Sequence, residues 1–213
     1  MQTVEHSTNQ KKIIGLTGPY CAGKNFIGRL LEERGLPVLD VDKLGHQAIE
    51  AGKAAILERF GVDILDEAGA IDRRLLGQKV FGSPAELAAL EGIVHPLANR
   101  MTDEWIAEQG DRPCVINAAL LHRSSVFKRL DCIFLVQAPF LVRLLRARKR
   151  DGLPLGQVLR RFKSQKDFTS QYLEKKVDIY IIENPGYFGF CAPLDRRRIE
   201  TRLNEILSRE GTA

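Results

Sequence analysis

An apolar segment that ends in a glycine-rich loop and continues as a helix constrains the fold of this chain more than any other feature. Residues 12–18, KIIGLTG, are apolar enough for a buried strand, and residues 25–35, NFIGRLLEERG, repeat apolar side chains at helical spacing. Residues 18–25 between them read GPYCAGKN, with the spacing G-x-x-x-x-G-K. A strand, such a loop and a helix surround a phosphate group with backbone N–H groups and the positive end of the helix dipole. The segment therefore predicts a phosphate-binding loop in an α/β protein, with Gly35 closing the helix.

The loop departs from the usual pattern at its eighth residue, where Ser or Thr is expected and Asn25 is found. The carboxamide oxygen of Asn25 can still ligate Mg²⁺, directly or through a water molecule. We expect Lys24 to neutralise the charge of the bound phosphates. The residues expected to surround the phosphates are Gly18, Cys21, Ala22, Gly23, Lys24, Asn25 and Phe26. A plain glycine-rich turn with a solvated lysine is the alternative.

Cys21 is an unusual residue inside such a loop. Beside Lys24 and several N–H groups, its thiol could have a lowered pKa and be open to oxidation. A small side chain that only fills space is the other interpretation. The remaining cysteines, at 114, 132 and 191, form no C-x-x-C pair, so the sequence indicates neither a zinc site nor a disulfide framework. We expect all four to be reduced thiols.

The rest of the sequence alternates apolar runs with helical spacing. Further strands are expected at 36–42, 113–121, 131–138 and 177–184, and helices at 139–150, 154–167 and 195–208, with a mostly helical stretch from 43 to 109. Strands that are apolar throughout and separated by helices predict a parallel sheet covered by helices on both faces. Ligands of such sheets bind at the carboxyl ends of the strands, so functional residues should directly follow each strand.

The second expected strand ends in LDVDK, residues 39–43. Asp40 and Asp42 would share one side of this strand, and Asp42 would emerge at the carboxyl edge of the sheet beside the loop. There it is a candidate general base for a substrate hydroxyl and a candidate contact of Mg²⁺, direct or through water. The simpler interpretation is that Asp42 caps a helix that begins near Lys43, and the two roles can coexist.

Arg143, Arg146 and Arg150 occur at i, i+3 and i+7 after the fourth strand and so share one face of a helix. A solvated surface face is one explanation. The other is a lid over a nucleoside triphosphate, whose guanidinium groups meet the charge that develops on a transferred phosphoryl group. Residues 143–176 hold eleven basic and three acidic side chains, an excess of +8 in a chain whose net charge is +5. Asp151-Gly152 marks a turn and a candidate hinge.

Length and composition are those of a globular protein with one domain. A chain of 213 residues can bury one sizeable core, and 44% hydrophobic with 28% charged residues is ordinary for a soluble protein. No stretch approaches the roughly 18 apolar residues of a membrane span. Residues 1–10 lack the features of a secretion signal, so we expect a disordered tail and a cytoplasmic protein. The pI of about 9.1 suits a phosphate-rich partner.

With these features placed, the sequence resembles the dephospho-CoA kinase family over residues 12–209. Beyond the loop, the resemblance is carried by GLPVLDVDKLGH, GAIDRRLLGQKVFGSPAELAALEGIVHP, LLRARKRDG and KKVDIYIIENPG. The IDRRLLGQKVF and IVHP strings separate this family from other small-molecule kinases. The resemblance implies a three-layer α/β P-loop kinase fold, with a five-stranded parallel sheet, the loop strand at its centre, a helical substrate-binding insert and a mobile lid.

The resemblance also implies a reaction and the residues that serve it. The γ-phosphoryl group of ATP, bound with Mg²⁺, would pass to the ribose 3′-hydroxyl of dephospho-CoA to give coenzyme A and ADP, the last step of coenzyme A synthesis. The implied catalytic residues are Lys24, Asp42, Arg146 and Arg150, and the implied metal contacts are Asn25 and Asp42. The adenine would meet the backbone of Asn184, Pro185 and Gly186, and dephospho-CoA would meet Asp42, His46, Arg73 and His95.

The expected organisation is a kinase domain at 11–209, with a dephospho-CoA-binding insert at 43–109 and a lid at 139–176, and a short tail at 210–213. We expect a monomer that binds ATP and dephospho-CoA, and neither nucleic acid nor membrane. For His95 a structural role is the alternative, because a histidine before a proline at a helix junction often has one.

Several positions depart from the family. After the third strand the family more often has an acidic residue, a proline and a glutamate, where this chain has Asn117, Ala119 and Arg123. The segment NPGYFGFCAPLD, residues 184–195, is longer than the usual adenine-side loop. A family member without activity is therefore one alternative. Another small-molecule kinase, acting on a nucleoside monophosphate or on shikimate, is a second. A non-catalytic nucleotide- or RNA-binding module is a third, although the basic segment lacks the interleaved aromatic residues that base stacking requires.

Overall fold

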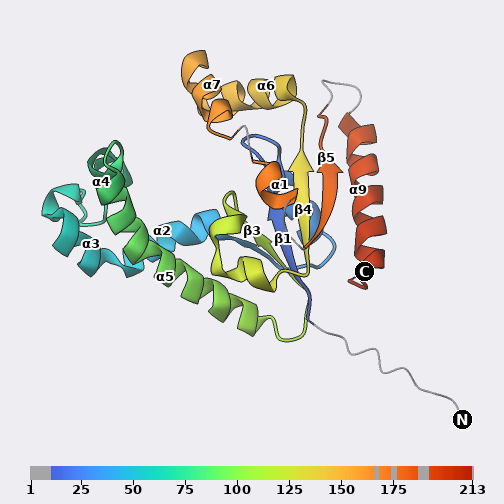
Figure 1. Ribbon diagram of the computed structural model, residues 1–213, viewed down its shortest axis with the longest axis horizontal. Helices are drawn as coiled ribbons and strands as arrows, with labels where there is room; N and C mark the ends of the chain where they lie inside the picture. The colour runs from blue at the N-terminus through green and yellow to red at the C-terminus, as the bar shows by residue number, and fades with distance from the viewer. Residues whose placement is uncertain (1–10, 166–167, 174–176, 187–191, 213) are drawn as a thin grey trace, which may run out of the picture. The chain divides into compact units, whose positions relative to one another are not determined.

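The computed structural model describes residues 11–165, 168–173, 177–186 and 192–212. Its strands are β1 (Ile13–Thr17), β2 (Val38–Asp40), β3 (Cys114–Asn117), β4 (Cys132–Gln137) and β5 (Asp178–Glu183). They form a five-stranded sheet in the order β2-β3-β1-β4-β5 (Figure 1). β1 pairs in parallel with β3 and β4, and β4 with β5. The predicted parallel α/β sheet is confirmed, with the strand that precedes the loop at its centre.

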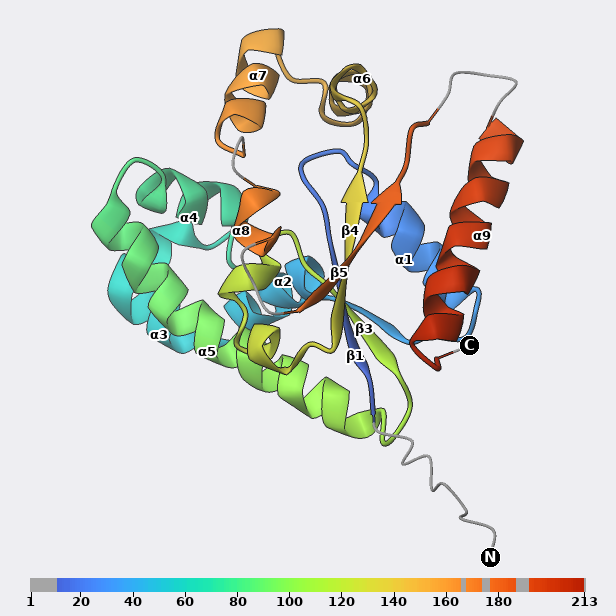
Figure 2. The same cartoon turned by 45° about the vertical axis from the view of Figure 1, so that its right-hand side comes forward.

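Two helices cover one face of this sheet. α1 (Lys24–Glu32) and α9 (Ala192–Arg209) lie together on that side of the strands (Figure 2). Ile27 of α1 and Leu203 of α9 are fully buried in one core with Leu16 of β1 and Phe134 of β4. Burying a side chain of this size contributes about 1.5–3 kcal/mol. This core fixes the start of α1, and with it the loop that precedes the helix, against the sheet.

α1 ends as its sequence predicts. After Glu32 a turn leads to Gly35, whose φ of 82° lies in the left-handed region. The N–H of Leu36 donates to the carbonyl of Leu31 at 3.1 Å, and the N–H of Gly35 donates to the carbonyl of Glu32 at 2.8 Å. These two bonds form the Schellman arrangement, in which a glycine closes a helix without the steric penalty that other residues have there.

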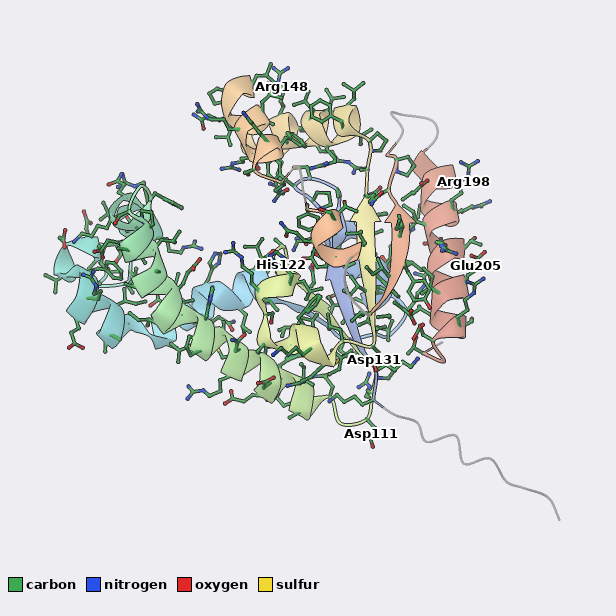
Figure 3. The ribbon with its side chains drawn as sticks, viewed as in Figure 1. Asp111, His122, Asp131, Arg148, Arg198 and Glu205 are labelled. Atoms are coloured by element: carbon green, nitrogen blue, oxygen red, sulfur yellow. The ribbon has the colours of Figure 1, made fainter. Side chains whose placement is uncertain are left out.

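Short helices cover the opposite face of β1. They are η2 (Leu121–Arg123), η3 (Ser125–Arg129) and α8 (Ser170–Leu173). A Cβ atom at Gly15 of β1 would come within 2.6 Å of the Leu121 side chain, so a larger residue would require this side chain to shift. His122 lies beside α8 (Figure 3), and its Nδ1 is 3.1 Å from the hydroxyl of the buried Tyr172. The expectation of helices on both faces of the sheet is confirmed.

The predicted third strand was too long. The sequence favours a strand over 113–121, but β3 ends at Asn117, and η2 begins only four residues later. The hydroxyl of Thr17 donates to the carbonyl of Ala118 at 2.8 Å. The chain leaves the sheet after this residue, and Leu120 is exposed instead of buried.

β4 leads into two helices of the predicted lid region. α6 (Phe140–Asp151) ends at Gly152, whose φ of 62° makes it a left-handed helix cap. α7 (Leu155–Lys163) follows after Pro154. The predicted turn at Asp151-Gly152 is confirmed, and its role as a hinge stays a prediction.

Residues Asp40–Glu108 form a second compact unit, and the first unit holds nearly all of the sheet. Its elements are α2 (Val41–Ala51), α3 (Lys53–Phe60), η1 (Val62–Ile64), α4 (Arg73–Val80) and α5 (Pro84–Glu108). Its core is made by Ile56, Phe60, Ile64, Ile71, Leu76 and Val80. The unit has nearly the bounds of the stretch, 43–109, in which the sequence predicts mostly helix.

Pro96 lies inside α5, which continues to Glu108 without a break. The helix junction expected at His95-Pro96 is therefore wrong. A proline in a helix removes one backbone hydrogen bond and crowds the preceding turn, and such a residue makes a helix end a reasonable expectation from sequence.

Among the described residues, no helix is long and apolar enough to cross a bilayer. The tail expected at 1–10 lies outside the described residues, as does the middle of the long segment after Gly186, residues 187–191.

Candidate active site

The loop between β1 and α1 has the backbone geometry of an anion-binding turn. Cys21 has a φ of 60° and Gly23 has a φ of 99°, both in the left-handed region. The N–H of Ala22 donates to the carbonyl of Pro19 at 2.9 Å, and Gly23 is the N-cap of α1, so Lys24 is the first residue of the helix. Left-handed residues in such a turn bring neighbouring N–H groups to one concavity, which here adjoins the positive end of α1. The loop is therefore suited to a phosphate group.

The two side chains after Gly23 are joined through β3. Lys24 Nζ donates to Asn117 Oδ1 at 3.1 Å, and Asn117 Nδ2 donates to Asn25 Oδ1 at 3.1 Å. Asn117 is 3% exposed, whereas Asn25 is exposed. Two residues that depart from the usual patterns, one in the loop and one at the end of β3, are thus in direct contact.

Arg146 of α6 lies against the same loop. Its guanidinium group donates to the carbonyls of Ala22 at 3.1 Å and Cys21 at 3.5 Å, and to Asn184 Oδ1 at 3.1 Å. Asn184 Nδ2 donates in turn to the carbonyl of Ala22 at 2.9 Å. Burial lowers the pKa of Arg146, but an arginine keeps its charge in proteins. The structure brings Arg146, Asn184 and the phosphate loop together, as the sequence predicts for a nucleotide site.

Glycine is required at two points of this contact. A Cβ atom at Gly23 would collide with the Asn184 carboxamide, and one at Gly186 would collide with the Arg146 guanidinium group. Both glycines have positive φ. The residue between Asn184 and Gly186, Pro185, lines a cavity of about 400 Å³ at the end of β5. Arg198 of α9, which also lines this cavity, is labelled in Figure 3. The predicted adenine-side segment thus adjoins both Arg146 and a cavity.

Arg143 contacts the loop at Tyr20, one residue before Cys21. Its Nε donates to the carbonyl of Tyr20 at 2.8 Å, and its guanidinium carbon lies 4.7 Å from the centre of the Phe162 ring of α7. Arg143 and Arg146 are partly buried, and burial lowers the pKa of both. The alternative of a solvated face is therefore wrong for Arg143 and Arg146, whereas Arg150 is exposed. Arg148, on the outer side of the same helix, is exposed (Figure 3).

Arg150 is engaged differently from Arg146. Its Nε donates to Asp151 Oδ1 at 2.6 Å, and its guanidinium group lies 5.1 Å from the centre of the Tyr20 ring. The hydroxyl of Tyr20 donates to Asp151 Oδ2, which also pairs with Arg161 of α7 at 3.1 Å. The hydrogen bonds from Arg150 and Tyr20 lower the pKa of Asp151 to about 2. A contact between Arg150 and a nucleotide stays a prediction, and it would require this ion pair to be broken or shared.

The pKa of Cys21 is shifted in the direction opposite to the one its sequence context suggested. Burial raises the pKa of this half-buried thiol, and the positive charge of Arg150 offsets that effect only in part. The expectation of a lowered pKa is therefore wrong, because the nearby cations do not compensate for the loss of solvent. A thiol with a raised pKa is a weak nucleophile at neutral pH, which favours the filler interpretation.

Asp42 is not where the sequence prediction puts it. β2 ends at Asp40, whose carboxylate accepts the N–H of Lys43 at 3.3 Å and caps α2. Asp42 lies in the first turn of α2, where it is exposed. Both earlier expectations, a strand-end position and a cap role for Asp42, are wrong, because the chain turns two residues earlier than LPVLDVD suggests. A carboxylate in the first turn is favourable to the helix dipole.

The other candidates for the acceptor side lie on separate helices of the second unit. His46 belongs to α2, Arg73 is the first residue of α4 and His95 belongs to α5. All three side chains are exposed. His95 is therefore not a core residue, and both its structural role and the proposal that these residues bind a substrate stay predictions.

Sequence reasoning did not name several residues that hold this site together. Asn117 was noted only as a departure, and Tyr20 and Gln165 not at all. The N–H of Tyr20 donates to Gln165 Oε1 at 2.7 Å, which adds a link from the loop to the end of α7. The only signal was indirect, since Asn117 directly follows an apolar run and therefore lies at the carboxyl edge of the sheet.

A parallel sheet of order β2-β3-β1-β4-β5, with a glycine-rich loop before a lysine-led helix, is the arrangement found in P-loop kinases. The family model for dephospho-CoA kinase matches residues 12–187. A dephospho-CoA kinase of Treponema denticola is 33% identical over 199 residues, which cover 88% of this chain and 87% of that protein. The chain therefore belongs to the dephospho-CoA kinase family.

Solved structures share the fold of this chain. A crystal structure of a protein from Thermus thermophilus matches with a TM-score of 0.76 at 31% identity, covering 94% of this chain and 98% of that one. Dephospho-CoA kinase from Campylobacter jejuni matches with a TM-score of 0.61 over 94% of this chain and 97% of its own. Since that pair is only 19% identical, the second match shows the shared fold alone.

Proposed function

We propose that this chain transfers the γ-phosphoryl group of ATP to the ribose 3′-hydroxyl of dephospho-CoA, giving coenzyme A and ADP. The observation that carries the proposal is the contact of Arg146 with the phosphate loop, in a chain of the dephospho-CoA kinase family. Transfer of a phosphoryl group needs positioning and charge neutralisation more than covalent assistance. A loop with N–H donors, a lysine and a partly buried arginine provides both.

On the nucleotide side, the loop amides would hold the phosphates and Lys24 would neutralise their β- and γ-oxygens. Arg146 would meet the charge that grows on the transferred group, since its guanidinium group already lies at the loop carbonyls. Arg150 would join it once released from Asp151. The adenine would lie against the backbone of Asn184 to Gly186, beside the cavity that Pro185 lines.

On the acceptor side, Asp42 would accept the proton of the ribose hydroxyl. Asp42 is an exposed carboxylate that follows β2 in the chain, and β2 lies next to β3 in the sheet. This location supports the assignment. His46, Arg73 and His95 would bind the phosphate groups and pantetheine arm of dephospho-CoA. Their exposure leaves them accessible to such a ligand.

ATP would bind with Mg²⁺, and the chain would supply only a few of the ligands of that ion. Among the described residues, no three His, Cys, Asp or Glu side chains gather as a metal cluster. Asn25 Oδ1 accepts one hydrogen bond from Asn117 and keeps a second lone pair for a hard cation or its water. Magnesium often takes most of its ligands from phosphate and water, so the Asn25 oxygen suffices for ATP alone, and Asp42 would contact the ion through water during transfer to the acceptor.

A reducing compartment and a monomer complete the proposal. Cys21, Cys114 and Cys132 are free thiols, which is usual for cytoplasmic proteins.

The acceptor is tested by ADP release with dephospho-CoA, AMP, shikimate or no acceptor, followed by identification of the phosphorylated product. Release that depends on dephospho-CoA, with coenzyme A as product, supports the proposal. Equal release with AMP or shikimate would overturn it.

A further inference from the structure

The carboxamides of Asn25 and Asn117 are joined in a fixed direction. A lysine ammonium group can only donate hydrogen bonds, so Asn117 must turn its oxygen toward Lys24, 3.1 Å away. Its amide nitrogen then faces Asn25, whose oxygen accepts at 3.1 Å. The ambiguity that usually attends the two ends of an asparagine side chain is removed here by the chemistry of Lys24.

Each asparagine stands where a standard phosphate loop has a different group. There the loop residue is a Ser or Thr hydroxyl and its partner on the neighbouring strand is an aspartate, and together they hold the metal. A hydroxyl donates to a carboxylate. In this chain the direction is reversed, because the strand residue donates and the loop residue accepts. The pair also carries no charge, so Asn117 does not neutralise the ammonium group of Lys24.

A single replacement at either position would break this match. An aspartate at 117 would have no hydrogen for the Asn25 oxygen, and its charge would pair with Lys24 in competition with the nucleotide. A serine at 25 is shorter than asparagine, so its oxygen would lie farther from Asn117. Changing both positions would bring back the hydroxyl and the carboxylate that together hold the metal in a standard loop.

We propose that Asn25 and Asn117 function as a matched amide pair, in which Asn117 is a positioning residue that fixes the Asn25 carboxamide and preserves the positive charge of Lys24 for the nucleotide. The inference rests on the proposed function for its nucleotide and deepens the account of that site. It has a consequence for the metal. A loop with a neutral pair depends less on Mg²⁺ to hold a nucleotide than a loop with a carboxylate, since it has more positive charge of its own.

The test is a double-mutant cycle with Asn25→Ser, Asn117→Asp and the double variant, read by calorimetric titration of ADP with Mg²⁺ and, separately, with EDTA. In Mg²⁺ we expect about a tenfold loss of affinity for Asn117→Asp and about a threefold loss for Asn25→Ser. The double variant should recover to within about threefold of the wild type. When EDTA replaces Mg²⁺, the affinity of the double variant for ADP should fall by about tenfold more than that of the wild type.

Asn204→Asp provides the matched control. It makes the same change of charge at an exposed residue of α9, whose carboxamide accepts from Arg34, and it should leave both affinities unchanged. Losses that simply add in the double variant, or an equal effect of EDTA on all proteins, would overturn the proposal. Since Asn117 is buried, circular dichroism checks each fold. Should Asn117→Asp unfold, Asn25→Ala and Asn117→Ala complete an equivalent cycle, in which additive losses count against the pair.

The same proteins separate this inference from the proposed function. If the ADP cycle is non-additive while no protein phosphorylates dephospho-CoA, the amide pair stands and the proposed acceptor is wrong. If all proteins phosphorylate dephospho-CoA but the losses add, the acceptor stands and the pair is wrong.

Discussion

The predicted nucleotide residues and the predicted acceptor residues are held in very different ways. Around the phosphate loop, Lys24, Arg143 and Arg146 each donate to another part of the first unit. In the second unit, His46, Arg73 and His95 are exposed on three separate helices. The first group is positioned by its own contacts before any ligand binds, whereas the second is displayed on a surface.

This difference has a functional meaning. A preorganised set of donors stabilises charge without having to reorganise, which is what a site for phosphoryl transfer requires. Exposed side chains on a helical unit can adapt to a long substrate, and ordering them costs free energy that the substrate must supply. We therefore expect changes around the loop to affect the nucleotide in the absence of any acceptor, and changes in the second unit to affect only the acceptor reaction.

Lys24→Ala should have the largest effect. It removes the cation at the start of α1, and we expect the rate of dephospho-CoA-dependent ADP release to fall about 1,000-fold or more. Lys128→Ala, at an exposed lysine of η3, serves as the control and should stay within about twofold of the wild type. If Lys24→Ala and Lys128→Ala have similar rates, Lys24 does not belong to a preorganised nucleotide site.

Asp42→Asn tests the acceptor side of the comparison. Loss of a general base lowers the rate by about 100- to 1,000-fold, so kcat should fall by that factor while the affinity for ATP alone stays the same. Steady-state kinetics with both substrates varied, together with ATP titrations, give the two numbers. A fall in ATP affinity that matches the fall in kcat would mean that Asp42 serves the nucleotide, against the division drawn here.

Arg146→Ala compared with Arg148→Ala sharpens the comparison within one helix. Arg146 contacts the loop carbonyls and Asn184, whereas Arg148 is exposed on α6. We expect kcat to fall about 100-fold for Arg146→Ala and by less than about twofold for Arg148→Ala. Equal effects would show that the arginine helix acts through its overall charge and not through the one residue at the loop.

Asp151→Asn should have the smallest effect, and one that depends on pH. Arg150 and Arg161 are largely exposed, so solvent weakens their pairs with Asp151, and we expect Tm to fall by only about 1–3 °C at pH 7. The pKa of Asp151 is lowered to about 2, so its contribution is present above the ordinary pKa of an aspartate and is lost as the pH falls through about 2. The difference in Tm between the two proteins should therefore shrink on acidification. A difference that grows toward low pH would contradict the ion pair.

Local patterns were enough to predict the sheet and the loop. The strand at 12–18, the loop spacing and the glycine at 35 all depend on residues close together in the sequence, and each is confirmed. Asp42 was misplaced because LDVD reads equally as the end of a strand or the start of a helix. Its outcome is decided by Asp40, whose carboxylate caps α2.

Contacts between distant segments could not be predicted. Asn25 and Asn117 are 92 residues apart, and Tyr20 is 131 residues from Asp151. No local periodicity marks either pair, because each arises when a helix or strand packs beside the loop. The same holds for the direction of the Cys21 pKa, which is set by burial and not by its neighbours in the sequence.

Calorimetric titration of ATP with Mg²⁺ into the full chain, with no acceptor present, tests the division between the two regions most directly. We expect one site per chain, with a dissociation constant of about 1–100 μM, and the same constant for Asp42→Asn. Binding that is absent until dephospho-CoA is added, or that weakens in Asp42→Asn, would show that the loop and its arginines do not form the nucleotide site by themselves.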